Sequence, residues 1–428
     1  MKVYYSLYGR MLDIRALYSG FKKVWRAKGA AGIDGQSLSD YALDLENNLK
    51  LLQHELQTRQ YQPQPVKRVE IPKDGGGVRL LGIPAVRDRI VQQALLDILQ
   101  PIFDPDFHPS SYGYRPKRSC HDAISKATLF IRQYDRRWVV DMDLSKCFDK
   151  LDHDLIIEGV RRRVTDGSIL RLLRQFLCSG VMVGNHWEAS EIGSPQGGVI
   201  SPLLANIYLD AFDQEMKRRN HRIVRYADDI LILCSSKAGA MNALASATQI
   251  LEKDLKLTVN RAKTHIAHSN DGVKFLGVEI GSRHTRIQEK KLKGLKQKVR
   301  QLTKRNGGKN LAEVIGQLNP VIRGFANYFS IADCSRQLKA LASWIRRRLR
   351  AVQLKLWKKP ARLHRRLKQL NYRPPFKYIK MNSWRNSASP LASFAMPNKW
   401  FVEQGLFQLE GVRTGWLAPS VYQHQKRG

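Results

Sequence analysis

The sequence is poor in acidic residues, and this shortage is its strongest compositional feature. Its 428 residues contain 37 Asp and Glu against 73 Lys and Arg, which gives a formal net charge of +36 at pH 7. Such a surplus favours a polyanionic partner, and nucleic acid is the commonest one. A membrane surface is the alternative, but the chain has no run of roughly 18 uncharged apolar residues that could span a bilayer. The first residues also do not resemble a signal peptide.

The sequence also lacks paired cysteines. Its five cysteines are odd in number, scattered, and never form a CxxC pair. This pattern disfavours both a disulfide framework and a structural zinc site. We therefore expect a protein of the cell interior.

What the chain does contain is enough apolar residues for two or three globular domains. The hydrophobic content is 43%, with 8 Trp and 15 Tyr. Most of the first hundred residues are typical of helices, including a helix that begins at Arg87 and that Pro101 closes. Residues 66–84 predict a hairpin around Gly75–Gly77, 136–144 a buried strand, and 221–234 a strand, a tight turn and a strand. Ser201 is expected as the N-cap of a helix with Pro202 at its first position.

The basic residues gather in one segment. Residues 291–370 hold 22 Lys or Arg and only two acids, so this segment carries +20. Within it, a helix over 341–359 is expected to turn an apolar face inward, with arginines opposite. The members of this face are Leu341, Trp344, Ile345, Leu349, Val352 and Leu356. We interpret the segment as a helical domain that binds nucleic acid.

Two acidic elements stand out because they interrupt apolar runs. Asp228 and Asp229 lie at the expected hairpin tip in RYADDILIL, where the ordinary explanation is that Asp favours turns. Asp141 and Asp143 lie two apart in VVDMDLSKCFD and so share one face of a strand, where a carboxylate needs a metal or a basic partner. Together these carboxylates suit two Mg²⁺ ions about 4 Å apart. Phosphoryl transfer needs little beyond such positioning and charge neutralisation.

The order of eight motifs resembles that of group II intron reverse transcriptases with maturase activity. The likeness covers nearly the whole chain and continues in RGFANYF and WIRRRLR. The eight motifs are GIDG (32–35), IPKDGGGVRLLGIP (71–84), SYGYRPKRS (111–119), VVDMDLSKCFD (139–149), SPQGGVISPLLANI (194–207), RYADD (225–229), VNRAKT (259–264) and FLGVEI (275–280).

The resemblance implies an α+β fold with right-hand polymerase architecture: fingers, a palm with an antiparallel sheet, a helical thumb and a basic helical maturase-like region. The implied domains are an N-terminal extension with fingers (1–110), further fingers and the palm (111–284), the thumb and maturase region (285–370) and a C-terminal maturase or DNA-binding tail (371–428).

The resemblance also implies the site residues. Asp143, Asp228 and Asp229 would be the catalytic metal ligands, with Asp141 as the second choice and Asp149 in the following turn. Phe148 would exclude a 2′-hydroxyl and so select deoxynucleotides. The other nucleotide contacts would be Lys73, Arg79, Gln196, Gly197 and Lys263, and the nucleic-acid contacts would be Phe275, Leu276, Gly277, Arg346, Arg347 and Arg348.

The resemblance further implies two Mg²⁺ ions, with Mn²⁺ as a possible substitute, and as partners template or intron RNA, a DNA primer or target, and dNTPs. Only about 55 residues follow the maturase-like region, without the Cys or His cluster of a zinc-supported nuclease, so the chain resembles compact members that lack an endonuclease. There are three alternatives. Phe148 and the motif set speak against an RNA-directed RNA polymerase, and the intact Asp143, Asp228 and Asp229 argue against an RNA-binding splicing cofactor without polymerase activity. A domesticated polymerase in host DNA repair or phage defence stays open. The sequence leaves the oligomeric state undecided.

Overall fold

The computed structural model describes residues 2–72, 77–184, 186–194 and 197–417. It divides into two compact units, residues 1–267 (unit 1) and 268–428 (unit 2). Both units mix helices with short sheets, which confirms the expected α+β class. None of the described helices is both long and apolar enough to cross a membrane.

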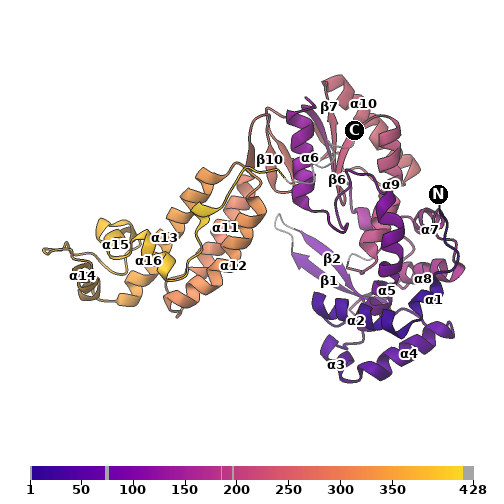
Figure 1. Ribbon diagram of the computed structural model, residues 1–428, viewed down its shortest axis with the longest axis horizontal. Helices are drawn as coiled ribbons and strands as arrows, with labels where there is room; N and C mark the ends of the chain where they lie inside the picture. The colour runs from indigo at the N-terminus through magenta and orange to yellow at the C-terminus, as the bar shows by residue number, and fades with distance from the viewer. Residues whose placement is uncertain (1, 73–76, 185, 195–196, 418–428) are drawn as a thin grey trace. The chain divides into compact units, whose positions relative to one another are not determined.

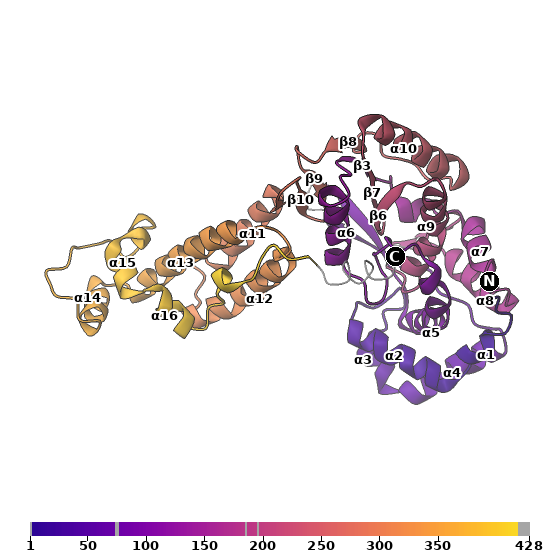
Figure 2. The same ribbon diagram turned by 45° about the horizontal axis from the view of Figure 1, so that its top comes forward.

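Unit 1 opens with helices that pack on one another through apolar faces. In α2 the buried residues Leu17, Gly20, Phe21 and Val24 follow helical spacing, and the Asp13 side chain caps the first turn by accepting from the backbone of Arg15. This face packs against α5, as Figures 1 and 2 show. The elements of this part are α1 (Tyr8–Met11), α2 (Ile14–Ala27), α3 (Leu38–Leu43), α4 (Leu45–Gln57) and α5 (Val86–Phe103).

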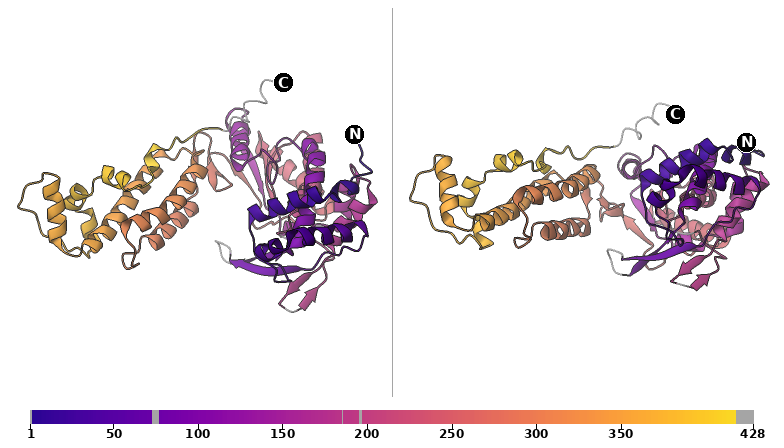
Figure 3. Two further views of the ribbon diagram at one scale, coloured as in Figure 1. Left: turned by 60° about the horizontal axis from the view of Figure 1, so that its bottom comes forward. Right: turned by 90° about the horizontal axis from the view of Figure 1, so that it is seen from below.

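The expected hairpin forms the centre of the first sheet. β1 pairs antiparallel with β2 from Lys67 opposite Ile83 to Pro72 opposite Val78. The other edge of β1 pairs in parallel with β4, so the strand order is β2-β1-β4-β5, visible in Figure 3. The strands are β1 (Val66–Pro72), β2 (Val78–Ile83), β4 (Val181–Val183) and β5 (His186–Glu188).

The second sheet, with the strand order β6-β7-β3-β8, carries the acidic residues. β7 is central and buried, and it pairs antiparallel with both β6 and β3. The helices α6, α9 and α10 pack against these strands. The elements are α6 (Cys120–Arg132), β3 (Trp138–Met142), α7 (His153–Arg161), α8 (Gly167–Leu177), α9 (Ser201–Arg218), β6 (Arg222–Tyr226), β7 (Asp229–Cys234), α10 (Lys237–Gln249) and β8 (His265–His268), with short helical turns η1 (Asp104–Asp106), η2 (Cys147–Lys150) and the π-helical η3 (Ile250–Asp254).

Unit 2 begins with a three-stranded antiparallel sheet and continues as helices. The long helix α13 buries Leu341, Ile345, Leu349 and Val352, as its apolar spacing predicts. The elements are β9 (Val273–Phe275), β10 (Val278–Ile280), β11 (Thr285–Ile287), α11 (Glu289–Leu302), α12 (Leu311–Phe329), α13 (Ser335–Trp357), α14 (Pro360–Gln369), η4 (Arg385–Ala388), α15 (Pro390–Ala395), α16 (Asn398–Glu403) and η5 (Leu409–Gly411).

Three local expectations are wrong. Pro101 does not close its helix, because α5 continues to Phe103, and a proline in the last turn disturbs few following residues. Ile200, not Ser201, is the N-cap of α9, and Ser201 begins the helix itself. Leu356 is exposed near the end of α13, in the last turn of the helix.

The close packing of α2 on α5 gives a stability prediction. A Cβ added at Gly20 would lie 2.9 Å from the carbonyl oxygen of Ile90 on α5. We expect Gly20→Ala to destabilise unit 1 by about 1 kcal/mol or more, since overpacking outweighs the better helix propensity of Ala. The measurement is the thermal midpoint by circular dichroism, with a drop of roughly 2–4 °C per kcal/mol. Gly316→Ala on α12 is the matched control, because open space surrounds Gly316. We expect its thermal midpoint to equal or exceed that of the wild type. If the midpoint of Gly20→Ala also stays unchanged, the packing argument is contradicted.

Candidate active site

The two adjacent aspartates lie at a tight turn between β6 and β7. Tyr226 pairs with Asp229, so only Ala227 and Asp228 form the turn. Ala227 has a left-handed backbone (φ 57°), which costs a residue with a Cβ about 1 kcal/mol or more. Other contacts must therefore hold the turn in this conformation.

A buried arginine below the turn supplies these contacts. Arg225 is fully buried and donates from Nε and Nη2 to the carboxylate of Asp213 on α9, at 2.6–2.9 Å. Its Nη1 donates to the backbone oxygen of Ala227 and to Oδ1 of Asn206, both at 3.0 Å. The ion pair thus joins the helix α9 directly to the backbone of the turn.

The segment Ser110–Tyr114 fastens the same turn from another direction. The backbone N–H of Arg225 donates to the Ser110 oxygen, and the N–H of Tyr112 donates to the Arg225 oxygen, both at 2.9 Å. A Cβ at Gly113 would lie 2.3 Å from the backbone nitrogen of Ala227. Only glycine fits this approach.

The third acidic residue reaches the same sheet edge from β3. The register of β3 on β7 ends with Met142 opposite Ile230, so the next residues along the two strands are Asp143 and Asp229. The sheet therefore brings Asp143 to the hairpin that carries Asp228 and Asp229. Asp141 also lies near this group, since burial first, and then the Asp143 charge, raise its pKa.

A loop after the π-helical turn η3 holds Asp143 in place. The Asn260 amide donates from Nδ2 to Oδ1 of Asp143 at 3.0 Å, and the Asn260 backbone N–H donates to the Asp143 carbonyl at 2.8 Å. The Lys263 ammonium lies 3.3 Å from Oδ2 of the same carboxylate. The Thr264 hydroxyl accepts from the Asp143 backbone N–H.

The charges at this edge repel one another. The pKa of Asp229 is raised to about 6, first by desolvation among the surrounding protein atoms, and then by the negative charges of Asp228, Asp141 and Asp143, while Lys263 opposes the shift. The Asp229 side chain nevertheless stays open to solvent. A cation that binds here would relieve the repulsion.

Among the described residues, no group of three or more His, Cys, Asp or Glu side chains is arranged so that it could hold a metal ion by itself. Mg²⁺, however, commonly takes only one or two carboxylates and completes its shell with waters and substrate phosphates. The Lys263 ammonium beside Asp143 shows that a positive charge fits this position. The carboxylates of Asp143 and Asp229 therefore offer oxygen donors at one sheet edge, of the kind that a divalent cation binds.

Phe148 lies next to a second aromatic ring that the sequence reasoning did not single out. The rings of Phe148 and Tyr114 meet edge to face with 6.4 Å between their centroids. Tyr114 is half exposed, and burial first, and then the negative charge of Asp228, raise its pKa, while Arg79 lowers it. Tyr114 therefore lies near both Phe148 and the acidic turn, and the charge of Arg79 acts on it too.

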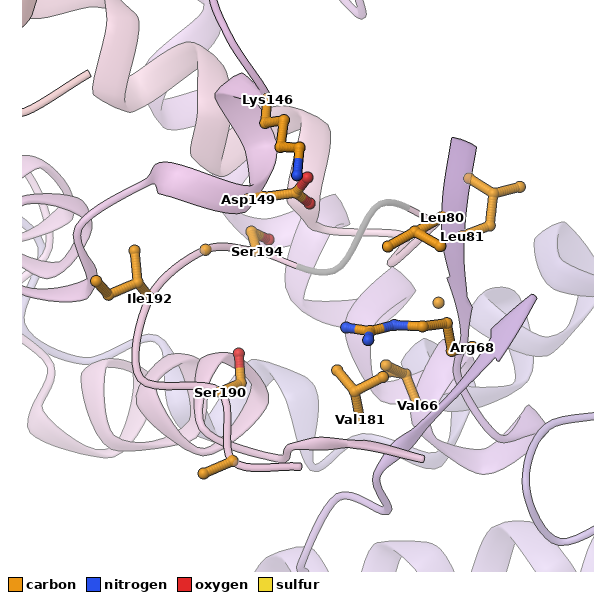
Figure 4. A pocket seen from close by; sticks show the side chains of 13 residues that line it. Val66, Arg68, Leu80, Leu81, Lys146, Asp149, Val181, Ser190, Ile192 and Ser194 are labelled. Carbon is orange, nitrogen blue, oxygen red and sulfur yellow. The ribbon is translucent and has the colours of Figure 1, made fainter. Parts of the chain in front are cut away.

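Gly197 has a structural need for glycine. Its φ is 118°, and a Cβ there would lie 2.4 Å from the carbonyl oxygen of Gly82 on β2. The predicted contacts Lys73 and Gln196 lie outside the described residues. Beside Gly82, a cavity of about 270 Å³ opens between β1, β2, η2 and residues 189–194. Figure 4 shows Arg68 reaching into it from one wall and Lys146 and Asp149 lying on another.

The remaining predicted residues belong to unit 2. Leu276 and Gly277, both with positive φ, form the two-residue turn between β9 and β10, as hairpin geometry favours, and Phe275 is buried at the end of β9.

Arg346, Arg347 and Arg348 on α13 contact other parts of unit 2. Arg346 pairs with Glu410. Arg347 lies over the ring of Trp384, and Arg348 lies between the rings of Trp344 and Trp384, at 5.5 and 5.0 Å. These contacts make the three arginines part of the packing of unit 2, and their expected nucleic-acid contacts stay a prediction.

The sequence reasoning missed the residues that position the site. The motifs contain Arg225 and Asn206 without giving them a role, and Asp213 lies outside every motif. An arginine is mostly exposed and gives no periodic signal when it is buried. The available signal was the polar Asn206 and Asp213 on an otherwise apolar helix, since buried polar groups need partners.

Comparison with known proteins agrees with the acidic site. Residues 71–280 match the family described as reverse transcriptase (RNA-dependent DNA polymerase), and residues 292–371 match the group II intron maturase-specific domain. Protein YkfC of Escherichia coli K12 is 38% identical over 302 residues, which cover 61% of this chain and 79% of that protein. The group II intron-encoded protein LtrA of Lactococcus lactis subsp. cremoris is 27% identical, with 80% of this chain and 73% of that protein covered.

A solved structure of telomerase from Candida albicans with a fragment of telomeric RNA is similar at a TM-score of 0.42 and 14% identity. That comparison covers 68% of this chain and 60% of the telomerase chain.

The buried ion pair below the turn can be tested by removing one charge. Asp213→Asn keeps the shape but leaves the Arg225 guanidinium without its counter-ion, so we expect a loss of about 3 kcal/mol or more. The measurement is unfolding in urea followed by circular dichroism. Asp210→Asn on the same helix is the matched control, because Asp210 accepts from the His108 backbone and Gln214 without a buried ionic partner. If Asp213→Asn lowers the free energy of unfolding no more than Asp210→Asn does, the role assigned to the Arg225–Asp213 ion pair is contradicted.

Proposed function

The chain belongs to the group II intron reverse transcriptases that carry a maturase domain, and on this basis we propose how its own residues support DNA synthesis. It is an RNA-directed DNA polymerase that also assists the splicing of its intron. Reverse transcriptases use divalent metal ions and bind nucleic acid. The alternatives of a domesticated polymerase and of a splicing cofactor without polymerase activity are not favoured.

One observation carries the proposed mechanism: β3 and the β6–β7 turn bring Asp143 next to Asp228 and Asp229 at one sheet edge, above the Arg225–Asp213 ion pair. We assign these three carboxylates to two Mg²⁺ ions, for which Mn²⁺ can substitute. When bound, these ions supply charge neutralisation for the attacking 3′-hydroxyl and for the triphosphate. The fixed turn matters because catalysis of this kind depends on positioning.

The reaction is a nucleotidyl transfer. The 3′-oxygen of the primer forms a bond to the α-phosphorus of the dNTP, the bond from that phosphorus to the bridging oxygen breaks, and pyrophosphate leaves. The proton of the 3′-hydroxyl passes to water. Asn260 keeps the Asp143 carboxylate oriented through its bond to Oδ1. We assign Lys263, whose ammonium pairs with Asp143, to the negative charge of the incoming triphosphate.

The remaining contacts surround the nucleotide. We assign Lys73 and Arg79 to the triphosphate, since Arg offers a bidentate contact and Lys a point charge. Gln196 and Gly197 are assigned to the space beside the template and the nucleotide. The rings of Phe148 and Tyr114 form an aromatic corner near the acidic turn, where Phe148 excludes a 2′-hydroxyl. Template RNA, intron RNA and a DNA primer or target are the proposed partners, and the bacterial cytosol the proposed location.

The first test concerns metal chemistry. Asp228→Asn keeps the side-chain shape but removes one charge and a strong ligand, so we expect primer extension with Mg²⁺ to fall by about 100-fold or more. Extension is measured with purified protein on an RNA template with dNTPs. Asp254→Asn, an exposed carboxylate on η3, is the control and should extend normally. Normal extension by Asp228→Asn with an unchanged Mg²⁺ requirement would exclude this assignment.

The second test concerns the choice of sugar. Phe148→Ala opens space beside C2′, so use of rNTPs relative to dNTPs should rise by roughly tenfold or more, as expected for a change of pocket size. The readout is the ratio of kcat/KM for the two nucleotides. Phe148→Tyr keeps the ring and should keep the dNTP preference. If both variants discriminate as the wild type does, Phe148 is a packing residue only.

A further inference from the structure

The C-terminal part of unit 2 continues past both family matches, and the stretch that leads into it has an unusual composition. The maturase match ends at residue 371, whereas the structure continues to 417. From Cys334 to Val402 the chain has no Asp or Glu and 18 Lys or Arg. Because the stretch has no carboxylates of its own, none of its acids competes with a polyanion for these basic side chains.

Two exposed aromatic rings stack on each other in this part. Tyr372 follows α14 and Phe394 lies on α15, and their ring centroids are 5.1 Å apart with an interplanar angle of 15°. Their relative exposures are 41% and 44%, so the pair does not lie in the core. Figures 1 and 2 show α14 and α15 next to each other. Tyr378, in the loop between them, is 68% exposed.

The backbone that carries Tyr372 is fixed. The N–H of Asn371 donates to the Lys368 carbonyl, and the N–H of Tyr372 donates to the Leu367 carbonyl, both at 3.0 Å. With Asn371 in the left-handed conformation (φ 64°), these bonds form a Schellman motif at the end of α14. A ring held in this way loses little conformational freedom when a ligand stacks on it.

Four basic residues lie close to Tyr372 in the sequence. Lys368, Arg373, Lys377 and Lys380 are all exposed, and none forms an ion pair with an acid in the part of the chain that the structure describes. They contrast with Arg346 and Arg348, whose charged groups are engaged by Glu410 and by tryptophan rings. Flat exposed rings among unpaired cations are the combination that binds unpaired bases together with their phosphates.

We propose that Tyr372 and Phe394 form a stacking platform for the bases of single-stranded RNA, with Lys368, Arg373, Lys377 and Lys380 contacting its phosphates. The proposal rests on the maturase function, because that function supplies a folded RNA with unpaired loops. Sequence-specific contacts to RNA are usually made where bases are unstacked and can lie on aromatic side chains. Duplex RNA hides its base faces and offers this platform only its phosphates.

The experiment measures the affinity of the full-length protein for a short unstructured oligoribonucleotide over a range of salt concentrations. Tyr372→Ala with Phe394→Ala should weaken binding about fivefold or more at every salt concentration and leave the salt slope unchanged, because stacking displaces no counterions. Arg373→Ala with Lys377→Ala should instead flatten the slope by up to about 0.7 for each phosphate that is no longer neutralised. Tyr372→Phe with Phe394→Tyr keeps both rings and should bind as the wild type does.

Two control variants distinguish base stacking from general apolar contact and from the effect of removing any exposed tyrosine. Tyr372→Leu with Phe394→Leu keeps apolar volume without flat rings, and it should lose RNA affinity as the alanine variant does. Tyr5→Ala removes an 80% exposed tyrosine from unit 1 and should leave RNA affinity intact. A circular dichroism melt of each variant shows whether unit 2 stays folded.

The outcomes separate this proposal from the function on which it rests. If the wild type binds no RNA, the maturase function itself fails. If the wild type binds but the alanine or leucine ring variant binds equally well, the platform alone is excluded. The platform is also excluded if the ring variants lose as much affinity for duplex RNA as for single-stranded RNA. It is excluded as well if they lose affinity only for single-stranded DNA of the same sequence.

Discussion

The geometry of the acidic site depends on the ion pair between Arg225 and Asp213, which has no exposure to solvent at all. Burying two charges costs several kcal/mol for each ion, and only a complete set of hydrogen bonds offsets that cost. Arg225 has such a set, since its donors reach Asp213, Asn206 and the Ala227 carbonyl. Because this side chain connects α9 to the turn, it helps to hold Ala227 in the left-handed conformation and Asp228 in position, together with the backbone contacts of Ser110 and Tyr112.

The site also shows how a very basic chain uses its few acids. Carboxylates from three sequence positions gather at one sheet edge, where their mutual repulsion contributes to raising the pKa of Asp229. Lys263 and Asn260 partly balance that repulsion by contacting Asp143. The arrangement therefore favours the binding of cations at this edge, while the positive surplus elsewhere attracts the polyanion that must reach it.

The local part of this architecture was predictable, and the long-range part was not. Alternating apolar residues predicted β3, β6 and β7, and the spacing of Asp141, Asp143, Asp228 and Asp229 indicated a shared site. Nothing local indicates that Arg225 is buried or that Tyr114 meets Phe148, because their partners lie 12 to 34 residues away. The start of α9 was misplaced by one residue for another reason: Ser201 is a favourable cap, but Ile200 takes that position.

The arginines of α13 show why net charge alone does not locate a binding surface. The helical pattern placed Arg346, Arg347 and Arg348 on a solvent face, but Trp384 and Glu410, which come later in the chain, cover that face. A planar, weakly hydrated guanidinium can be covered by aromatic rings and remain charged, whereas a lysine ammonium keeps its water. The charge of +20 in residues 291–370 therefore overstates the charge that is free to meet phosphates. Lys290, Lys291 and Lys298 of α11 and the basic residues that follow α14 are exposed, so we expect the phosphate contacts of unit 2 among exposed cations of this kind.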